Sequence, residues 1–335
     1  MSALRYPWSA LALAGLLWAI PGFVLAQNLP AADVGIHAWL LRVHEASRYR
    51  AYSGTFVVSA AGNMASAKIW HVSDGEQQVE RVESLSGKPR ATFRRNDQVV
   101  TFFPESKVAV VETRESLGQF PGLIQSTPSS IGDTYQLKRL GGERIAGFDS
   151  DVVQLMPNDN LRFGYRVWSE KRTGLVMQLQ TLDLDGRVLE QSAFSELRLD
   201  APISMGKLHQ MMGNTKGFRV ERPDLQKVTP ESQGWALQRP VKGFQTMGCY
   251  RRLNSPTAGS SRADAPMQWV FSDGLATVSL FVETFDSRRH GREGYTNLGG
   301  ATHTLTRHLG EWWATVVGEV PIGTLMAFAT ALERK

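Results

Sequence analysis

The sequence predicts a mainly β protein with a minority of helix (α+β), divided into a large and a small β-rich unit. Two observations support this fold class. Short segments rich in Val, Phe, Tyr and Thr recur between turn dipeptides such as Asp74-Gly75 and Asp185-Gly186. A segment with scattered Pro and Gly, residues 201–232, then interrupts this pattern. We therefore expect a signal peptide at 1–26, a large domain at 27–200, a linker at 201–232 and a small domain at 233–335.

The first 26 residues have the organisation of a secretory signal. Arg5 precedes the apolar stretch 10–24, and Val24-Leu25-Ala26 forms a small-residue cleavage site before Gln27. An uncleaved membrane anchor is the alternative, but Pro21-Gly22 breaks the apolar run, which is shorter than the roughly 20 residues that a span needs. No Cys follows the cleavage site for acylation. We expect a soluble periplasmic chain that begins at Gln27.

The large unit is predicted to begin with a helix and to continue as a meander of strands. Ile36, Trp39, Leu40 and Val43 have helical spacing within 33–48, and Asp33 is placed to cap the first turn. About a dozen paired strands must curl or close, because open twisted sheets rarely exceed about 10 strands. Residues 117–124 fit a short helix or lid. The predicted strands are 53–60, 65–72, 77–85, 91–95, 99–103, 107–111, 135–140, 143–148, 150–156, 163–169, 175–183 and 188–199.

Aromatic side chains are frequent in these strands, and a curled sheet would use them in one of two ways. They line a cavity for a lipid, or they fill a core with no space for a ligand; the sequence leaves both open. The candidates for a lipid pocket are Phe56, Trp70, Phe93, Phe102, Phe120 and Trp168.

The small unit is predicted to combine further strands with a C-terminal helix. Within the preceding linker, 207–212 fits one helical turn or a partner contact. Pro321 suits the first turn of the final helix, which runs to about residue 332. Residues 255–266 and 288–294 are expected to be loops. The predicted strands are 246–253, 267–271, 276–284, 301–305 and 312–317.

The charge balance is mildly basic, with a formal net charge of +5. Export removes nucleic acid as a partner, so acidic protein segments and phosphorylated lipid headgroups remain. Arginine pairs fit phosphate or carboxylate groups, although solvated surface arginines are the alternative. The candidates for an anionic ligand or partner are Arg251, Arg252, Arg288, Arg289 and Arg292, and the loop that holds the last three is the first to test.

Motifs of catalysis and metal binding are missing from the sequence. There is no G-x-S-x-G, H-E-x-x-H, P-loop or dinucleotide fingerprint. His303 and His308 are five residues apart, a spacing that does not stack ligands on one helix face. Cys249 is the only cysteine, and a buried apolar role suits it better than that of a hydrolase nucleophile. We therefore expect a protein that is not an enzyme and has no catalytic residue, metal or cofactor.

Several segments of the chain form a recognisable set. They are the run 313–321 (WATVVGEVP) before the final helix, 182–191 (LDLDGRVLEQ), Trp235-Ala236-Leu237, Gly243-Phe244 and Val167-Trp168. Together they resemble the RseB/MucB family of periplasmic negative regulators of an envelope-stress sigma factor (sigma-E/AlgU), and the resemblance extends over essentially the whole mature chain.

This resemblance implies a fold and a function. The large domain is expected to be an unclosed antiparallel β-barrel of the LolA/LolB type with helices on its concave side, followed by a smaller antiparallel β domain. The chain is expected to bind the periplasmic region of an RseA/MucA-type anti-sigma factor, to protect it from proteolysis, and to release it on sensing lipopolysaccharide or mislocalised lipoprotein. A periplasmic lipid or lipoprotein carrier is the alternative, and the oligomeric state stays open.

Overall fold

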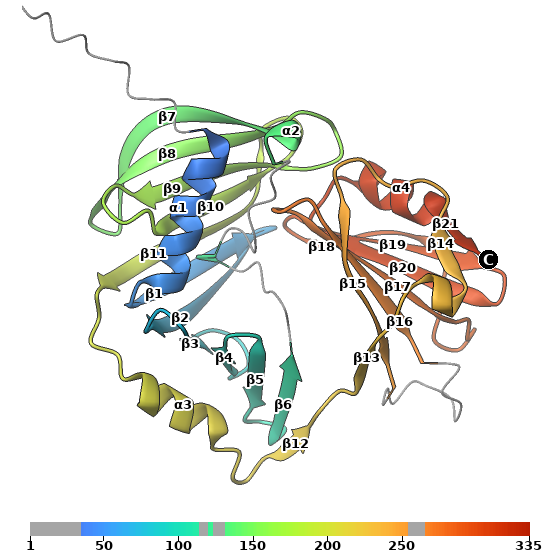
Figure 1. Ribbon diagram of the computed structural model, residues 1–335, viewed down its shortest axis with the longest axis horizontal. Helices are drawn as coiled ribbons and strands as arrows, with labels where there is room; N and C mark the ends of the chain where they lie inside the picture. The colour runs from blue at the N-terminus through green and yellow to red at the C-terminus, as the bar shows by residue number, and fades with distance from the viewer. Residues whose placement is uncertain (1–34, 114–119, 123–130, 254–264) are drawn as a thin grey trace, which may run out of the picture. The chain divides into compact units, whose positions relative to one another are not determined.

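The computed structural model describes residues 35–113, 120–122, 131–253 and 265–335, and most of its strands form two separate sheets (Figure 1). One sheet has 12 strands and the other has seven. The mainly β fold class with a large and a small sheet is confirmed. The expected signal peptide, most of the expected lid at 117–124 and most of the loop 255–266 lie outside the described residues.

The large sheet is unclosed, because its strand order runs in a line from β12 to β7 and these two strands do not pair with each other. Neighbouring strands are antiparallel except β12, which is parallel to β6. In sheet order the strands are β12 (Arg219–Glu221), β6 (Val108–Thr113), β5 (Gln98–Phe103), β4 (Ala91–Arg95), β3 (Gln78–Ser84), β2 (Asn63–Ser73), β1 (Tyr52–Ala60), β11 (Val188–Leu199), β10 (Val176–Leu182), β9 (Gly164–Glu170), β8 (Phe148–Pro157) and β7 (Tyr135–Ile145).

Helix α1 (Ile36–Tyr49) confirms the predicted amphipathic helix and supplies part of the core of the large sheet. Trp39, Leu40 and Val43 are buried in one cluster with side chains from β8, β9 and β10, and α1 crosses in front of these strands in Figure 1. Gly35 is at the N-cap, whereas Asp33 lies outside the described residues. At 14 residues α1 is too short to cross a membrane, and so is every other helix in the described part of the chain.

The sequence prediction was wrong at β7, where it placed two strands separated by Gly141-Gly142. Those glycines lie within one strand, and a β-bulge between Arg139 and Gly141 shifts the register there. Gly141 has φ of 110°, a left-handed value that glycine adopts without strain. The real turn is at Ala146-Gly147, where both residues have positive φ, and Phe148 therefore belongs to β8.

Residues 201–232 contain more regular structure than a linker composition indicates. Ser204 caps helix α3 (Met205–Gly213) by accepting a hydrogen bond from the backbone N–H of Lys207. Met212 of α3 is buried against Phe93 and Phe102 of the large sheet. The segment ends with β12 on the large sheet, β13 (Leu225–Lys227) on the small sheet and the short 3-10 helix η1 (Glu231–Gln233).

The small sheet has its own core, formed with helix α4 (Ile322–Ala331). Val278, Leu280 and Val316 of the sheet and Leu325 and Phe328 of α4 are all fully buried there. In sheet order its strands are β13, β15 (Gln245–Arg252), β16 (Met267–Ser272), β17 (Thr277–Thr284), β20 (Trp312–Gly318), β19 (Thr302–Leu309) and β18 (Gly294–Gly299), and β14 (Trp235–Leu237) pairs separately with β21 (Leu332–Arg334).

The predicted C-terminal helix is confirmed, with Pro321 at its N-cap. Strands β12, β13, β14, β18 and β21 were not predicted. Four of them have only three residues, and β18 is almost wholly exposed at an edge of the sheet. Neither kind of strand produces an apolar alternation in the sequence.

Candidate binding site

Five polar side chains form a row across one face of the large sheet, which we call the polar row. The strand registers place Gln154 opposite Arg166, Arg166 opposite Gln180, Gln180 opposite Gln191, and Gln191 opposite Ser59. Residues directly opposite one another in paired strands point to the same face. Five strands, β8, β9, β10, β11 and β1, thus each contribute one polar group to a continuous line.

Hydrogen bonds connect the central members of the polar row. An Nη1–H of Arg166 donates to Oε1 of Gln180 at 3.5 Å, and Nε2 of Gln180 donates to Oε1 of Gln191 at 2.6 Å. A guanidinium group donates hydrogen bonds and accepts none. Because Arg166 only donates, Gln180 turns its oxygen toward the arginine, and the oxygen of Gln191 turns toward Gln180 and Gln178, which both donate to it.

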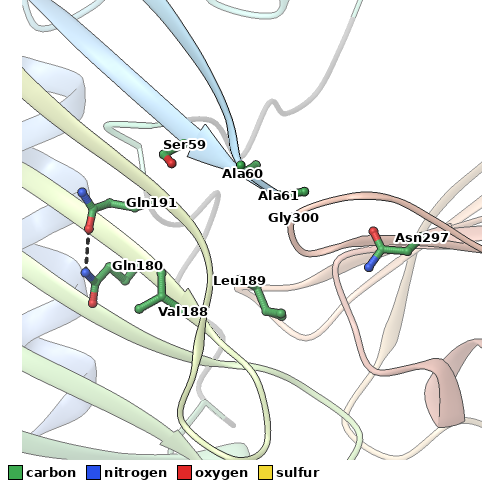
Figure 2. A pocket seen from close by; sticks show the side chains of 10 residues that line it. Ser59, Ala60, Ala61, Gln180, Val188, Leu189, Gln191, Asn297 and Gly300 are labelled. Atoms are coloured by element: carbon green, nitrogen blue, oxygen red, sulfur yellow. Dashed lines mark hydrogen bonds between the residues drawn. The ribbon is translucent and has the colours of Figure 1, made fainter.

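A pocket of about 550 Å³ lies at the Gln180 and Gln191 end of the polar row. Figure 2 shows these two side chains joined by their hydrogen bond, with Asn297 and Gly300 of the β18–β19 hairpin across the pocket from them. We call this the amide pocket. The described residues that line it are Ser59, Ala60, Ala61, Gly62, Gln180, Val188, Leu189, Gln191, Asn297 and Gly300.

Two carboxyl groups with raised pKa values lie near the amide pocket. Glu190 approaches Gly300 so closely that a Cβ on that glycine would be 2.7 Å from Oε2 of Glu190. Burial raises the pKa of Glu190, and the N–H of Ala301 opposes this by a hydrogen bond. Burial also raises the pKa of Glu319, with a further contribution from the charge of Glu190. Both carboxyls therefore hold their protons to higher pH in the folded chain than in the unfolded chain.

Replacing Glu190 with glutamine is expected to stabilise the protein at pH 7.5 but not at pH 4. A raised folded pKa gives stability that is fully present below the unfolded value near 4.5 and is lost as pH rises through the folded value. We expect a gain of roughly 0.5 kcal/mol at pH 7.5, since Glu190 is only half-buried. Chemical denaturation at both pH values measures this. Glu105→Gln, at an exposed turn, is the control, and equal gains at both pH values would contradict the assignment.

A buried ion pair connects the large sheet to the small one. Arg162, in the connection between β8 and β9, is fully buried and its Nη1 lies 2.7 Å from Oδ2 of Asp273, in the turn between β16 and β17. Asp159 and the backbone carbonyl of Lys242 accept further hydrogen bonds from the same guanidinium. Because burial raises the pKa of Tyr135 well above its ordinary value, its hydroxyl stays protonated and donates to Asp273 at 3.1 Å.

The six predicted lipid-pocket residues lie in two groups. Phe56 and Phe120 pack together, with ring centroids 5.5 Å apart, and both contact Phe194. Phe93 and Phe102 pack with α3, and the guanidinium of Arg81 covers Trp70 and also contacts Phe93. Trp168 is buried in the same cluster as Phe56 and donates a hydrogen bond to Glu143. Their role in lipid binding stays a prediction.

The five predicted anion-binding arginines also do not converge. Arg251 and Arg252 are on β15. Arg288 forms two hydrogen bonds with Asp286, which lower the pKa of that carboxyl, and Arg289 forms an ion pair of 2.7 Å with Glu283. Arg292 is exposed. Acidic side chains of the protein therefore already neutralise part of the charge of the 288–292 loop.

Cys249 is buried, and burial raises the pKa of its thiol to about 11. The thiol is therefore protonated at neutral pH and is a poor nucleophile. Among the described residues no three His, Cys, Asp or Glu side chains are close enough together to hold a metal ion.

Sequence reasoning missed Arg162, Arg166 and the glutamines of the polar row. Each glutamine and Arg166 lies in a strand that was predicted, but nothing in the sequence indicates which strand residues are opposite one another. Arg162 precedes a predicted strand without any motif around it. The register and the packing of the two sheets bring these residues together.

The fold and the site place the chain in the class of mainly β, two-sheet proteins with a polar pocket. Two family models match it. The MucB/RseB N-terminal domain matches residues 35–212, and the MucB/RseB C-terminal domain matches residues 229–333. The chain therefore belongs to the MucB/RseB family.

Named relatives are similar over nearly their whole length. The sigma factor AlgU regulatory protein MucB of Pseudomonas aeruginosa is 27% identical, over 97% of this chain and 96% of that protein. The sigma-E factor regulatory protein RseB of Escherichia coli is 23% identical, over 96% of each. The crystal structure of MucB in complex with MucA(peri) is 25% identical, covers 89% of this chain and 98% of that one, and has a TM-score of 0.67.

Proposed function

We propose that this chain is a periplasmic regulator that binds the periplasmic region of an RseA/MucA-type anti-sigma factor. Bound to this chain, the anti-sigma factor is protected from regulated proteolysis, and envelope lipid releases it. The observation that carries the proposal is the match of both family domains to one chain, together with its similarity to a MucB solved with MucA(peri). Relatives named as sigma-factor regulatory proteins support the same role.

The proposal includes export and a division of the chain. Residues 1–26 direct the protein to the periplasm and are removed there, which leaves a soluble chain. Residues 27–200 and 233–335 act as the two domains, joined by 201–232. Arg5 and the apolar stretch 10–24 support export, and the separate cores of the two sheets support the division.

Release by lipid requires that the lipid binds the free regulator more tightly than the regulator in complex with its partner. A ligand shifts an equilibrium only by the difference of its affinities for the two forms. The contact of Phe56 and Phe120 supports the large sheet as the site for acyl chains. The exposed Arg288 and Arg292 remain the proposed contacts for phosphate groups.

The experiment that tests this function uses the purified mature chain and the periplasmic domain of a MucA-type anti-sigma factor. Isothermal titration calorimetry is expected to detect a complex, and the chain is expected to slow cleavage of that domain by a DegS-type protease. Added lipopolysaccharide is expected to restore cleavage. Protection that persists at saturating lipopolysaccharide would contradict lipid sensing alone. Lipid binding without any complex would favour the lipid carrier instead.

A further inference from the structure

Arg166 is a half-buried cation without a counter-ion among the described residues. No carboxylate there lies within ion-pair distance of its guanidinium. Within the described part of the chain its buried Nε–H has no hydrogen-bond partner, and its one bond to a side chain is the long contact of 3.5 Å with Gln180. A buried donor without a partner destabilises the fold. The contrast with Arg162, which has Asp159 and Asp273 as ion-pair partners, points to a function for Arg166 other than packing.

The polar row ends in hydrogen-bond donors at the amide pocket. Since Arg166 turns the oxygen of Gln180 toward itself, the Nε2 of Gln180 faces Gln191 and occupies the oxygen of that residue. The Nε2 of Gln191 is then the last donor of the hydrogen-bonded chain, next to Ser59 at the end of the row, and both residues line the pocket. Chains of hydrogen bonds polarise one another, so the positive charge of Arg166 strengthens this terminal donor. The pocket is therefore built for a hydrogen-bond acceptor that carries negative charge.

The lining distinguishes between classes of ligand. Among the described lining residues, Val188 and Leu189 are the only large apolar side chains, too few to enclose an acyl chain, while Gln180, Gln191 and Asn297 carry carboxamides. Carboxamides pair well with a peptide backbone, and a single arginine matches a single carboxylate. Glu190 precedes Gln191 on the strand and so points to the opposite face, toward Gly300.

We propose that the amide pocket and the polar row bind an extended segment of the anti-sigma partner through an Asp or Glu side chain of that segment. The carboxylate accepts hydrogen bonds from Gln191 and is paired with Arg166, whose loosely held guanidinium turns to meet it. Gln180 lies between these two residues, and its hydrogen bond to Gln191 keeps the Nε2 of Gln191 directed away from the arginine. This inference rests on the proposed function for the identity of the partner, and it adds the site and the chemistry of recognition.

The test compares variants of the full mature chain for binding to the periplasmic domain of a MucA-type anti-sigma factor by calorimetry. Arg166→Gln removes the charge and is expected to weaken binding roughly tenfold to a hundredfold, and to reduce its dependence on salt. Gln191→Glu replaces the terminal donor with a carboxylate of the same size and is expected to have at least as large an effect. Arg144→Gln, an exposed arginine of the same sheet, is the matched control and is expected to bind like the parent.

Thermal unfolding confirms that each variant is folded, and a second readout follows from the partner. Each Asp or Glu of the partner is replaced in turn by Asn or Gln, and the affinity of each partner variant is measured for the parent chain and for Arg166→Gln. One replacement is expected to weaken binding to the parent chain but to have little further effect on binding to Arg166→Gln. Unchanged binding by Arg166→Gln and Gln191→Glu overturns the inference and leaves the proposed function standing. If the parent chain does not bind the domain at all, the proposed function is overturned, and so is the inference that this site binds the anti-sigma partner. Loss of binding to phosphatidylglycerol vesicles with intact partner binding overturns the inference in favour of a lipid site.

Discussion

Replacing Arg162 with methionine is expected to lower the free energy of unfolding by about 3–5 kcal/mol, the usual effect of removing one member of a buried ion pair. The variant leaves the carboxylate of Asp273 buried with no cation to balance it. It also removes the hydrogen bonds to Asp159 and to the carbonyl of Lys242. Because these partners belong to both sheets, the loss affects the contact that connects the two cores.

Chemical denaturation followed by tryptophan fluorescence measures the effect of Arg162→Met. Arg172→Met is the matched control, because that arginine is 82% exposed and its contact with Glu170 is 3.6 Å; we expect almost no change. The double variant Arg162→Met, Asp273→Asn removes the unbalanced charge and is expected to recover part of the loss. A decrease below about 1 kcal/mol in Arg162→Met would show that the pair is not buried as described.

Replacing Gly54 with alanine is expected to destabilise the protein by about 2–3 kcal/mol, at the upper end of the range for overpacking. Gly54 lies in β1, between β2 and β11. A Cβ there would overlap the backbone carbonyl oxygen of Glu196 and lie 2.9 Å from the ring of Phe194. The carbonyl cannot move without disturbing the pairing of β1 with β11, and the ring of Phe194 is held by Phe56 and Phe120.

Gly206→Ala is the control for Gly54→Ala, since a Cβ at Gly206 would meet nothing within 4 Å. Gly206 lies in helix α3, where alanine is favoured over glycine by about 0.8–1.0 kcal/mol. The same chemical change is thus expected to have opposite signs at the two positions, as measured by the midpoint of denaturation. A neutral Gly54→Ala variant would mean that β11 moves away from β1 at little cost, next to the register shift between Thr55 and Phe56.

The prediction of individual strands succeeded where turn chemistry marks their ends. Asp185-Gly186 and Asn96-Asp97 fall in turns between paired strands of the structure, so β10–β11 and β4–β5 were placed within a few residues. The same logic failed at Gly141, where a glycine that allows a bulge has the same sequence signal as a glycine that ends a strand. Local conformation alone does not distinguish the two cases, because the pairing with β8 decides between them.

The candidate site was much less predictable than the strands. Gln154, Arg166, Gln180 and Gln191 are far apart along the chain, and each looks like an ordinary half-exposed strand residue. A shift of one residue in any of three registers would turn one of them to the other face of the sheet and break the row. The predicted arginines of the 288–292 loop are conspicuous in sequence, yet the fold gives two of them acidic partners.

The sequence by itself determined the mainly β fold class, the positions of α1 and α4, and the resemblance to the MucB/RseB family, because apolar periodicity, turn residues and family patterns are local or cumulative signals. Only the tertiary structure decided which side chains meet. The pairing of Arg162 with Asp273 connects residues 111 positions apart, and the polar row depends on four successive strand registers. Such contacts follow from the packing of whole sheets, in which the burial of many side chains sets the position of each one.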